Sequence, residues 1–144
     1  MADDIQLATL EAIAADATVT ALTTKAYTGG IPQSITLPAY VVDVVSNNAT
    51  EHLAGSALST ARVRINAYGT TPTEANTLAE AIRTEVMKAN HKGSFGVANA
   101  MNVRDITLAA GPFRDRDAPV DGSDEFRPFV TADYFVTYKQ TGPS

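Results

Sequence analysis

Few side chains in this chain are of the types that carry acid–base or nucleophilic chemistry. The 144 residues include no cysteine and two histidines, His52 and His91. A serine nucleophile needs a base within hydrogen-bond reach and often lies in a motif such as G-x-S-x-G, which does not occur. Walker A and H-E-x-x-H motifs are absent as well. Both histidines fall in polar or helix-terminal contexts, so we interpret them as solvated. The sequence predicts no enzymatic activity, no cofactor and no bound metal.

A charged segment before the last predicted strand offers oxygen ligands for calcium. Its four aspartates within a short span are Asp115, Asp117, Asp121 and Asp124. An EF-hand loop has acids at alternate positions, followed by glycine and a closing glutamate. Pro119 and Val120 break that spacing, so we expect no calcium site. The alternating run at 114–117 is better interpreted as charge pairs within the segment or with a neighbouring chain. It consists of Arg114, Asp115, Arg116 and Asp117.

Two arginines on a predicted strand are the third set of candidate functional residues. Arg62 and Arg64 alternate with apolar residues, so both point away from the predicted core, and Tyr68 lies further along the same face. Two arginines and an aromatic ring could bind a nucleic-acid strand, or another subunit could cover them. The formal net charge of −5 is the wrong sign for binding a phosphate backbone. We therefore favour a subunit contact, with a solvated strand face as the remaining alternative.

The strand that holds these arginines leads into a clearly delimited helix. Thr71 stands at the N-cap position, Pro72 suits the first helical position, and Glu74 completes a T-x-x-E capping box. Apolar residues then recur at helical spacing. Gly93 is the predicted terminator of this helix. The change from a period of two to a helical period predicts a strand at 61–68 whose apolar face the helix covers.

The remaining elements follow from the same kinds of pattern. We expect a first helix after Asp3 and a short second helix after Asp16. Further along we expect a strand at 40–45, a polar connection at 46–59, one or two strands within 94–111, a charged loop at 111–128, a last strand at 129–138 with its even-numbered residues in the core, and a short flexible tail at 141–144. Together these predict a single α+β domain over residues 1–144. Its antiparallel or mixed β-sheet has about four to five strands, with two to three helices packed on one face.

The N-terminal sequence and the charge distribution limit the cellular context. Met1–Asp4 is acidic, whereas a signal peptide starts with a basic and then an apolar region. No apolar run reaches the roughly 20 residues of a membrane-spanning helix, so we expect no membrane contact. Residues 1–60 hold six acidic side chains and one lysine. We interpret this as ordinary solubility, with a surface that repels nucleic acid or attracts a basic partner as the alternative.

Several segments also carry a family resemblance through their order and spacing. They are Ala15–Leu22, Pro32–Gln33, Leu37–Pro38, Tyr40–Val42, Ala61–Tyr68, Thr73–Ala75, Leu78–Arg83 and Asp124–Arg127. In this order the chain resembles the phage tail-completion family, which includes tail terminators and tail-to-head joining proteins. The resemblance covers nearly the whole chain.

This resemblance implies a structural virion protein. A tail terminator forms a ring, expected to be a hexamer, that caps the tail tube and joins it to the head or neck. The implied partners are copies of the chain itself, the tail tube protein and a neck or head-completion protein, while DNA passes through the lumen without sequence-specific binding. The protein would assemble in the host cytoplasm and reside in the virion tail or neck. We expect subunit or inter-ring contacts at Glu51 and His52 in one loop, at Arg114, Asp115, Arg116 and Asp117 in another, and at Arg62 and Arg64 in the ring wall.

Two alternative functions stay open at this point. A head-side neck adaptor, or head completion protein, would contact the portal, and its ring could have another size. A small α+β ligand-binding domain or enzyme would instead gain thermal stability from a metabolite.

Overall fold

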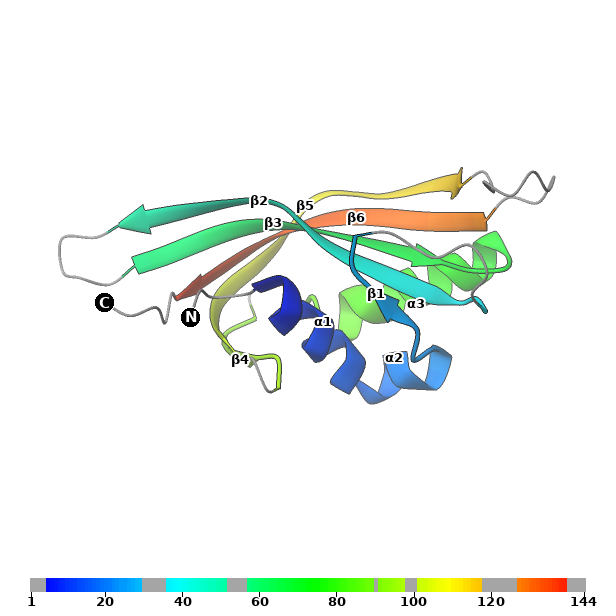
Figure 1. The fold of residues 1–144 in the computed structure, drawn as a ribbon, viewed down its shortest axis with the longest axis horizontal. Coiled ribbons are helices and arrows are strands. Elements are labelled where there is room, and N and C mark those ends of the chain that lie inside the picture. Colours follow the sequence, from blue (N-terminus) through cyan, green and yellow to red (C-terminus); the bar gives the residue numbers. More distant parts are fainter. Residues whose placement is uncertain are drawn as a thin grey trace.

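A long, curled sheet with helices on one of its faces forms the described part of the protein (Figure 1). The computed structural model describes residues 5–29, 36–51, 57–89, 91–97, 101–117 and 127–139, with the backbone alone at 48–51, 57, 115–117 and 127. The elements are α1 (Ile5–Ala15), α2 (Ala17–Leu22), β1 (Ala26–Tyr27), β2 (Ala39–Glu51), β3 (Ala57–Tyr68), α3 (Pro72–Glu85), β4 (Gly93–Phe95), β5 (Met101–Asp117) and β6 (Arg127–Lys139). None of the helices described here is long and apolar enough to cross a membrane.

The sheet is mixed, and in the described part of the chain it has six strands in the order β1-β2-β3-β6-β5-β4. β1 runs parallel to β2, and the other neighbouring pairs are antiparallel. All three helices lie on one side of the sheet in Figure 1, with α3 against β3 and β6 and α1 against β2. The predicted α+β class is therefore confirmed. The sheet exceeds the expected four to five strands because its edges, β1 and β4, have only two and three residues, too few to show a periodic pattern.

The β2–β3 pair extends beyond its predicted ends. β2 continues to Glu51 and β3 begins at Ala57, so the predicted polar connection at 46–59 is wrong for most of its length. A polar side chain of this extension bonds across the sheet, because the Asn47 side-chain amide donates to the Tyr138 hydroxyl at 2.7 Å.

The predicted charged loop at 111–128 is also wrong for part of its length, because β5 extends into it. The strand runs to Asp117 and β6 begins at Arg127, so the first part of the expected loop is strand. Gly111 has a φ of 91° and lies where the register with β6 shifts, after which strand pairing resumes. A bulge that contains glycine and proline interrupts the alternation of a strand without ending it, which explains the error.

The apolar core fills the space between the helices and the inner face of the sheet. On β6 the even-numbered residues from Val130 to Tyr138 are buried, as predicted. Gln6 joins α1 to the sheet, because its Oε1 accepts a hydrogen bond from the Val44 backbone N–H at 2.9 Å. The largest fully buried side chains include Tyr40, Tyr138, Ile13, Leu78, Ile82, Ile106 and Val63. Packing on this face fixes which side chains must point to the opposite face.

The helix α3 ends earlier than predicted. Its last residue is Glu85, and Gly93, the predicted terminator, instead begins β4. Val86 and Met87 follow the helix and are both buried. Val86 keeps the helical spacing because the core needs an apolar side chain at this position. The chain can bury that side chain without continuing the helix.

Thr71 caps α3 as predicted, which gives a direct test of the helix start. Its hydroxyl accepts a hydrogen bond from the Glu74 backbone N–H at 3.1 Å. Thr71→Ala should lower the free energy of unfolding by about 1 kcal/mol, because it leaves a helix N–H without this partner. Thr73→Ala, an exposed position in the same first turn, is the matched control. Equal losses of stability for the two variants in urea unfolding would contradict the cap.

Candidate subunit interface on the outer face of the sheet

Two arginines and an aspartate meet on the face of the sheet opposite the helices, here called the outer face. Arg62 Nε donates to Asp133 Oδ2 at 2.8 Å, and Arg64 Nε donates to Asp133 Oδ1 at 2.8 Å. Arg64 Nη2 adds a bond to Oδ2 at 3.1 Å. Strand pairing explains the meeting, because Asp133 of β6 lies opposite Arg64 of β3, and Arg62 is the next residue of β3 on the same face.

The aspartate of this ion cluster is buried and its arginines are not. Asp133 is 4% exposed, whereas the side chains of Arg62 and Arg64 are 36% and 46% exposed. The hydrogen bond from Arg64 is the main reason that the pKa of Asp133 lies below its ordinary value; the Arg62 bond acts in the same direction and burial opposes both. Because each guanidinium has five N–H donors, both arginines keep donors that Asp133 does not use.

A hollow of about 340 Å³ beside the ion cluster is lined by aromatic side chains. Phe113, in its lining, is 60% exposed, and Phe135 nearby is 40% exposed, with the Arg62 guanidinium 5.8 Å from its ring centroid. Tyr68 stacks on Phe129 with their ring centroids 5.0 Å apart. Exposed aromatic rings beside arginines are typical of surfaces that other protein chains cover.

Two polar atoms at the same hollow lack a hydrogen-bond partner within the described ranges. Asn66 Oδ1 and Thr131 Oγ1 are buried, and their residues lie opposite each other on β3 and β6. A buried polar atom without a partner costs about 1–3 kcal/mol. A further molecule that supplied hydrogen bonds at this hollow would remove that cost.

Among the other predicted contact residues, Arg114 has a described side chain, and it lies away from the ion cluster. Arg114, on β5, reaches the helix side, where its Nη2 lies 3.4 Å from Asn76 Oδ1 of α3. Glu51 ends β2 and Asp117 ends β5, and these strands end at opposite ends of the sheet (Figure 1). His52, Asp121 and Asp124 lie outside the described residues, as do the side chains of Glu51, Asp115, Arg116 and Asp117. Of the predicted site residues with described side chains, the structure brings together Arg62 and Arg64.

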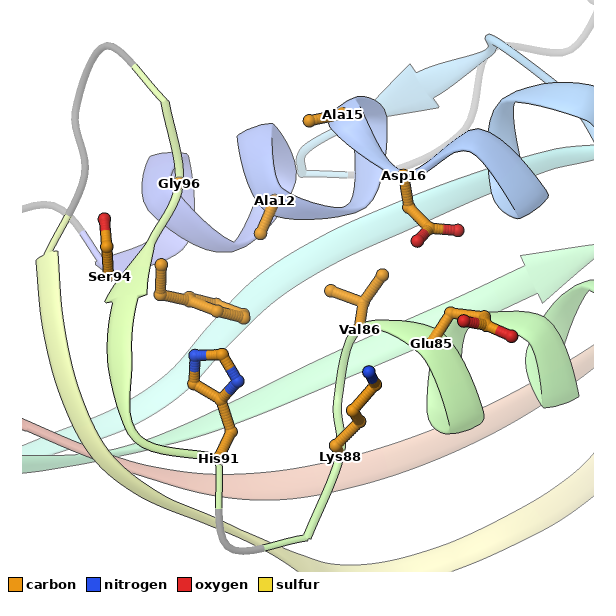
Figure 2. A pocket seen from close by; sticks show the side chains of 10 residues that line it. Ala12, Ala15, Asp16, Glu85, Val86, Lys88, His91, Ser94 and Gly96 are labelled. Atoms are coloured by element: carbon orange, nitrogen blue, oxygen red, sulfur yellow. The ribbon is translucent and has the colours of Figure 1, made fainter.

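A second hollow, of about 280 Å³, lies between α1, α3 and β4, and we call it the helix-side hollow (Figure 2). His91 lines it and is half-buried, so the prediction of a solvated His91 is wrong. Its ring lies 5.5 Å from that of Phe95, edge to face, and its Nε2 is buried without a partner among the described residues. The described residues contain no group of three or more histidines and carboxylates that could bind a metal ion.

Asp133 is the residue of the ion cluster that the sequence analysis missed as a site residue. It is the sole charged residue between Val130 and Tyr138 and has the outward phase of the last strand. That signal is visible in the sequence. The position of β6 beside β3 is not, because local periodicity does not specify which distant strands pair.

Comparison with known proteins identifies the family. A family model described as "Tail completion protein gp17" matches residues 8–127, most of the chain, so the protein belongs to this family of phage tail completion proteins, as the sequence resemblance predicted. A chain in the solved structure "Virion of native gene transfer agent (GTA) particle" is 13% identical over 87% of both chains, with a TM-score of 0.53. At this identity the likeness supports the fold alone. No curated protein matches the chain. Family membership supports a structural role in a phage virion.

The ion cluster predicts a loss of stability when its charge is removed. Asp133→Asn should lower the free energy of unfolding by about 1–3 kcal/mol at pH 7, because both guanidinium groups lose a charged acceptor. Asp105→Asn is the matched control, since Asp105 is a half-buried aspartate of β5 outside the described ion pairs. Urea unfolding that gives the same loss for both variants would argue against the cluster.

The same cluster predicts the pH dependence of stability. The pKa of Asp133 in the folded state is below the ordinary value of about 3.9. Its contribution is therefore complete above that value and is lost as the pH falls through the folded-state pKa. The difference in free energy of unfolding between wild type and Asp133→Asn should narrow below about pH 4. A difference that stays constant from pH 7 to pH 2 would show that the carboxylate is not stabilised by its partners.

Proposed function

We propose that this protein is a tail terminator, a structural and non-enzymatic virion protein that forms a hexameric ring on the end of the tail tube. The ring joins the tail to the head or neck, so its partners are other copies of the chain, the tail tube protein and a neck protein. DNA passes through the lumen without sequence-specific contact. Within the tail completion family, the observation that carries this proposal is the outer face, where arginines with unused donors stand beside exposed aromatic rings.

The dimensions of the outer face suit an interface between copies. β2, β3 and β6 have 13, 12 and 13 residues, which corresponds to a length of about 40 Å. Four long strands side by side, β2, β3, β6 and β5, span about 19 Å, so the plane of the sheet measures about 760 Å². A plane of this size has room for a standard protein interface, which buries roughly 800 Å² of accessible surface per partner. In a ring each copy uses two different surfaces, and the outer face would be one of them.

The two ends of the sheet would serve contacts above and below the ring. In this proposal residues 1–144 fold as one domain, and the segment at Glu51 and His52 lies toward one neighbouring ring. The segment that comprises Arg114, Asp115, Arg116 and Asp117 lies toward the other. Support comes from the opposite ends of the sheet at which β2 and β5 finish.

A charged side chain at the hollow of the outer face should weaken ring formation. Phe113→Asp removes an exposed aromatic ring without breaking an ion pair, so the subunit should still fold. We expect at least about a tenfold rise in the concentration needed to cap tail tubes. Val97→Asp is the matched control, because Val97 is 64% exposed but does not line the hollow. Equal capping by the two variants in electron micrographs would contradict this role of the outer face.

Reversal of the charges near the end of β5 tests the proposed contact between rings. Arg114→Glu combined with Arg116→Glu should reduce joining of tails to heads because like charges would then face the partner. Unchanged ring formation and tail joining would remove this segment from the contacts.

Electron microscopy of the protein with and without its tail tube tests the function as a whole. A ring at the end of the tube is the expected result. A ring at the portal of the head would identify a neck adaptor. A monomer that ignores tail ends and turns over a small substrate would contradict the proposal.

A further inference from the structure

Three cationic side chains line a third hollow, of about 560 Å³, here called the basic hollow. They are Lys92, just before β4, Arg104 of β5 and Lys139, the last residue of β6. Strand pairing accounts for their convergence, because Lys139 lies opposite Leu58 of β3 and Asn102 of β5, and both of these residues line the hollow. Lys139 has the same phase along β6 as Asp133, so it points to the outer face.

Within the described residues, these three charges are not neutralised. Lys92, Arg104 and Lys139 belong to none of the ion pairs found there, whereas Arg62 and Arg64 share a carboxylate. The lining of the basic hollow, as far as the chain is described, contains no carboxylate. Three like charges around one concave surface repel one another and create a local positive potential that favours an anion.

Two carboxylates line the hollow on the helix side of the molecule. Asp16 and Glu85 line the helix-side hollow, and in Figure 2 their carboxylates lie at the end away from His91. Lys88 also lines this hollow. Glu85 is exposed and belongs to none of the ion pairs of the described part. It is therefore a carboxylate free to meet a cation on another molecule.

We infer that the basic hollow receives carboxylates from the helix side of a second copy of this chain, with Glu85 as the leading contact to Lys92, Arg104 and Lys139. This inference rests on the proposed ring, and it names which surfaces meet. Such a contact joins two different surfaces, so it can repeat around a ring. It would also place the outer face of one copy against the helix side of the next.

The overall charge favours a second copy over DNA as the source of the anion. The chain has a net charge of −5 and a pI of about 4.8, so a phosphate backbone is repelled at long range. The same excess of acids supplies carboxylates when copies meet. Charge complementarity between two surfaces of one chain also fixes their relative orientation.

Charge reversal with rescue tests the pairing. Lys139→Glu and Glu85→Lys should each raise the concentration for half-maximal ring assembly on tail tubes at least about tenfold, because each places like charges together. The double variant should return to within about threefold of wild type, since it restores opposite charges. Lys25→Glu is the matched control and should assemble as wild type, because Lys25 is an exposed lysine that lines none of the three hollows.

Each outcome of this experiment decides the inference. Normal assembly of both single variants, or single defects without rescue in the double variant, overturns it while the ring itself stands. Normal assembly of Lys139→Glu together with loss of its binding to fluorescent duplex DNA overturns it in favour of a phosphate partner. Wild-type protein that forms no ring on tail tubes contradicts the proposed function itself.

Discussion

In the described part of the chain, the helices pack on one face of the long sheet and leave its outer face uncovered. The inner side chains of β3 and β6 are buried against α3. Because side chains alternate between the two faces of a strand, every second side chain must then point to the outer face. A sheet in an α+β protein can leave such a face to water. Here, however, Phe113 and Phe135 are exposed on it, and two polar atoms are buried there without partners in the described chain. These features favour a covering molecule over solvent.

Asp133 positions the charged side chains of this face, because its buried carboxylate binds the guanidinium groups of both Arg62 and Arg64. The aspartate fixes the guanidinium stems of Arg62 and Arg64 through their Nε atoms. Their remaining N–H donors are consequently held in place, which would lower the entropy lost if the proposed partner bound them. A chain with net negative charge can thus present local positive surface at defined positions.

The sequence predicts which helices and long strands occur better than it predicts how long the strands are and which strands pair. Local signals were sufficient for the Thr71 cap and for the buried phase of β6, since both depend on adjacent residues. The lengths of β2 and β5 were missed because Asn47 bonds across the sheet and Gly111 occupies a bulge, and neither fact is visible in a periodic pattern. The arginines of the site could be named in advance, whereas Asp133 required knowledge of which strands pair. Loop contacts expected at Glu51 and His52 stay a prediction.

In the proposed ring a neighbouring copy covers the outer face of each subunit. A cryo-electron microscopy map of the protein bound to the end of its tail tube would show whether it does. The expected result is density of an adjacent subunit over Arg62, Arg64 and Phe113. A map in which this face is open to solvent in every copy, or in which a single copy sits on the tube, would contradict it.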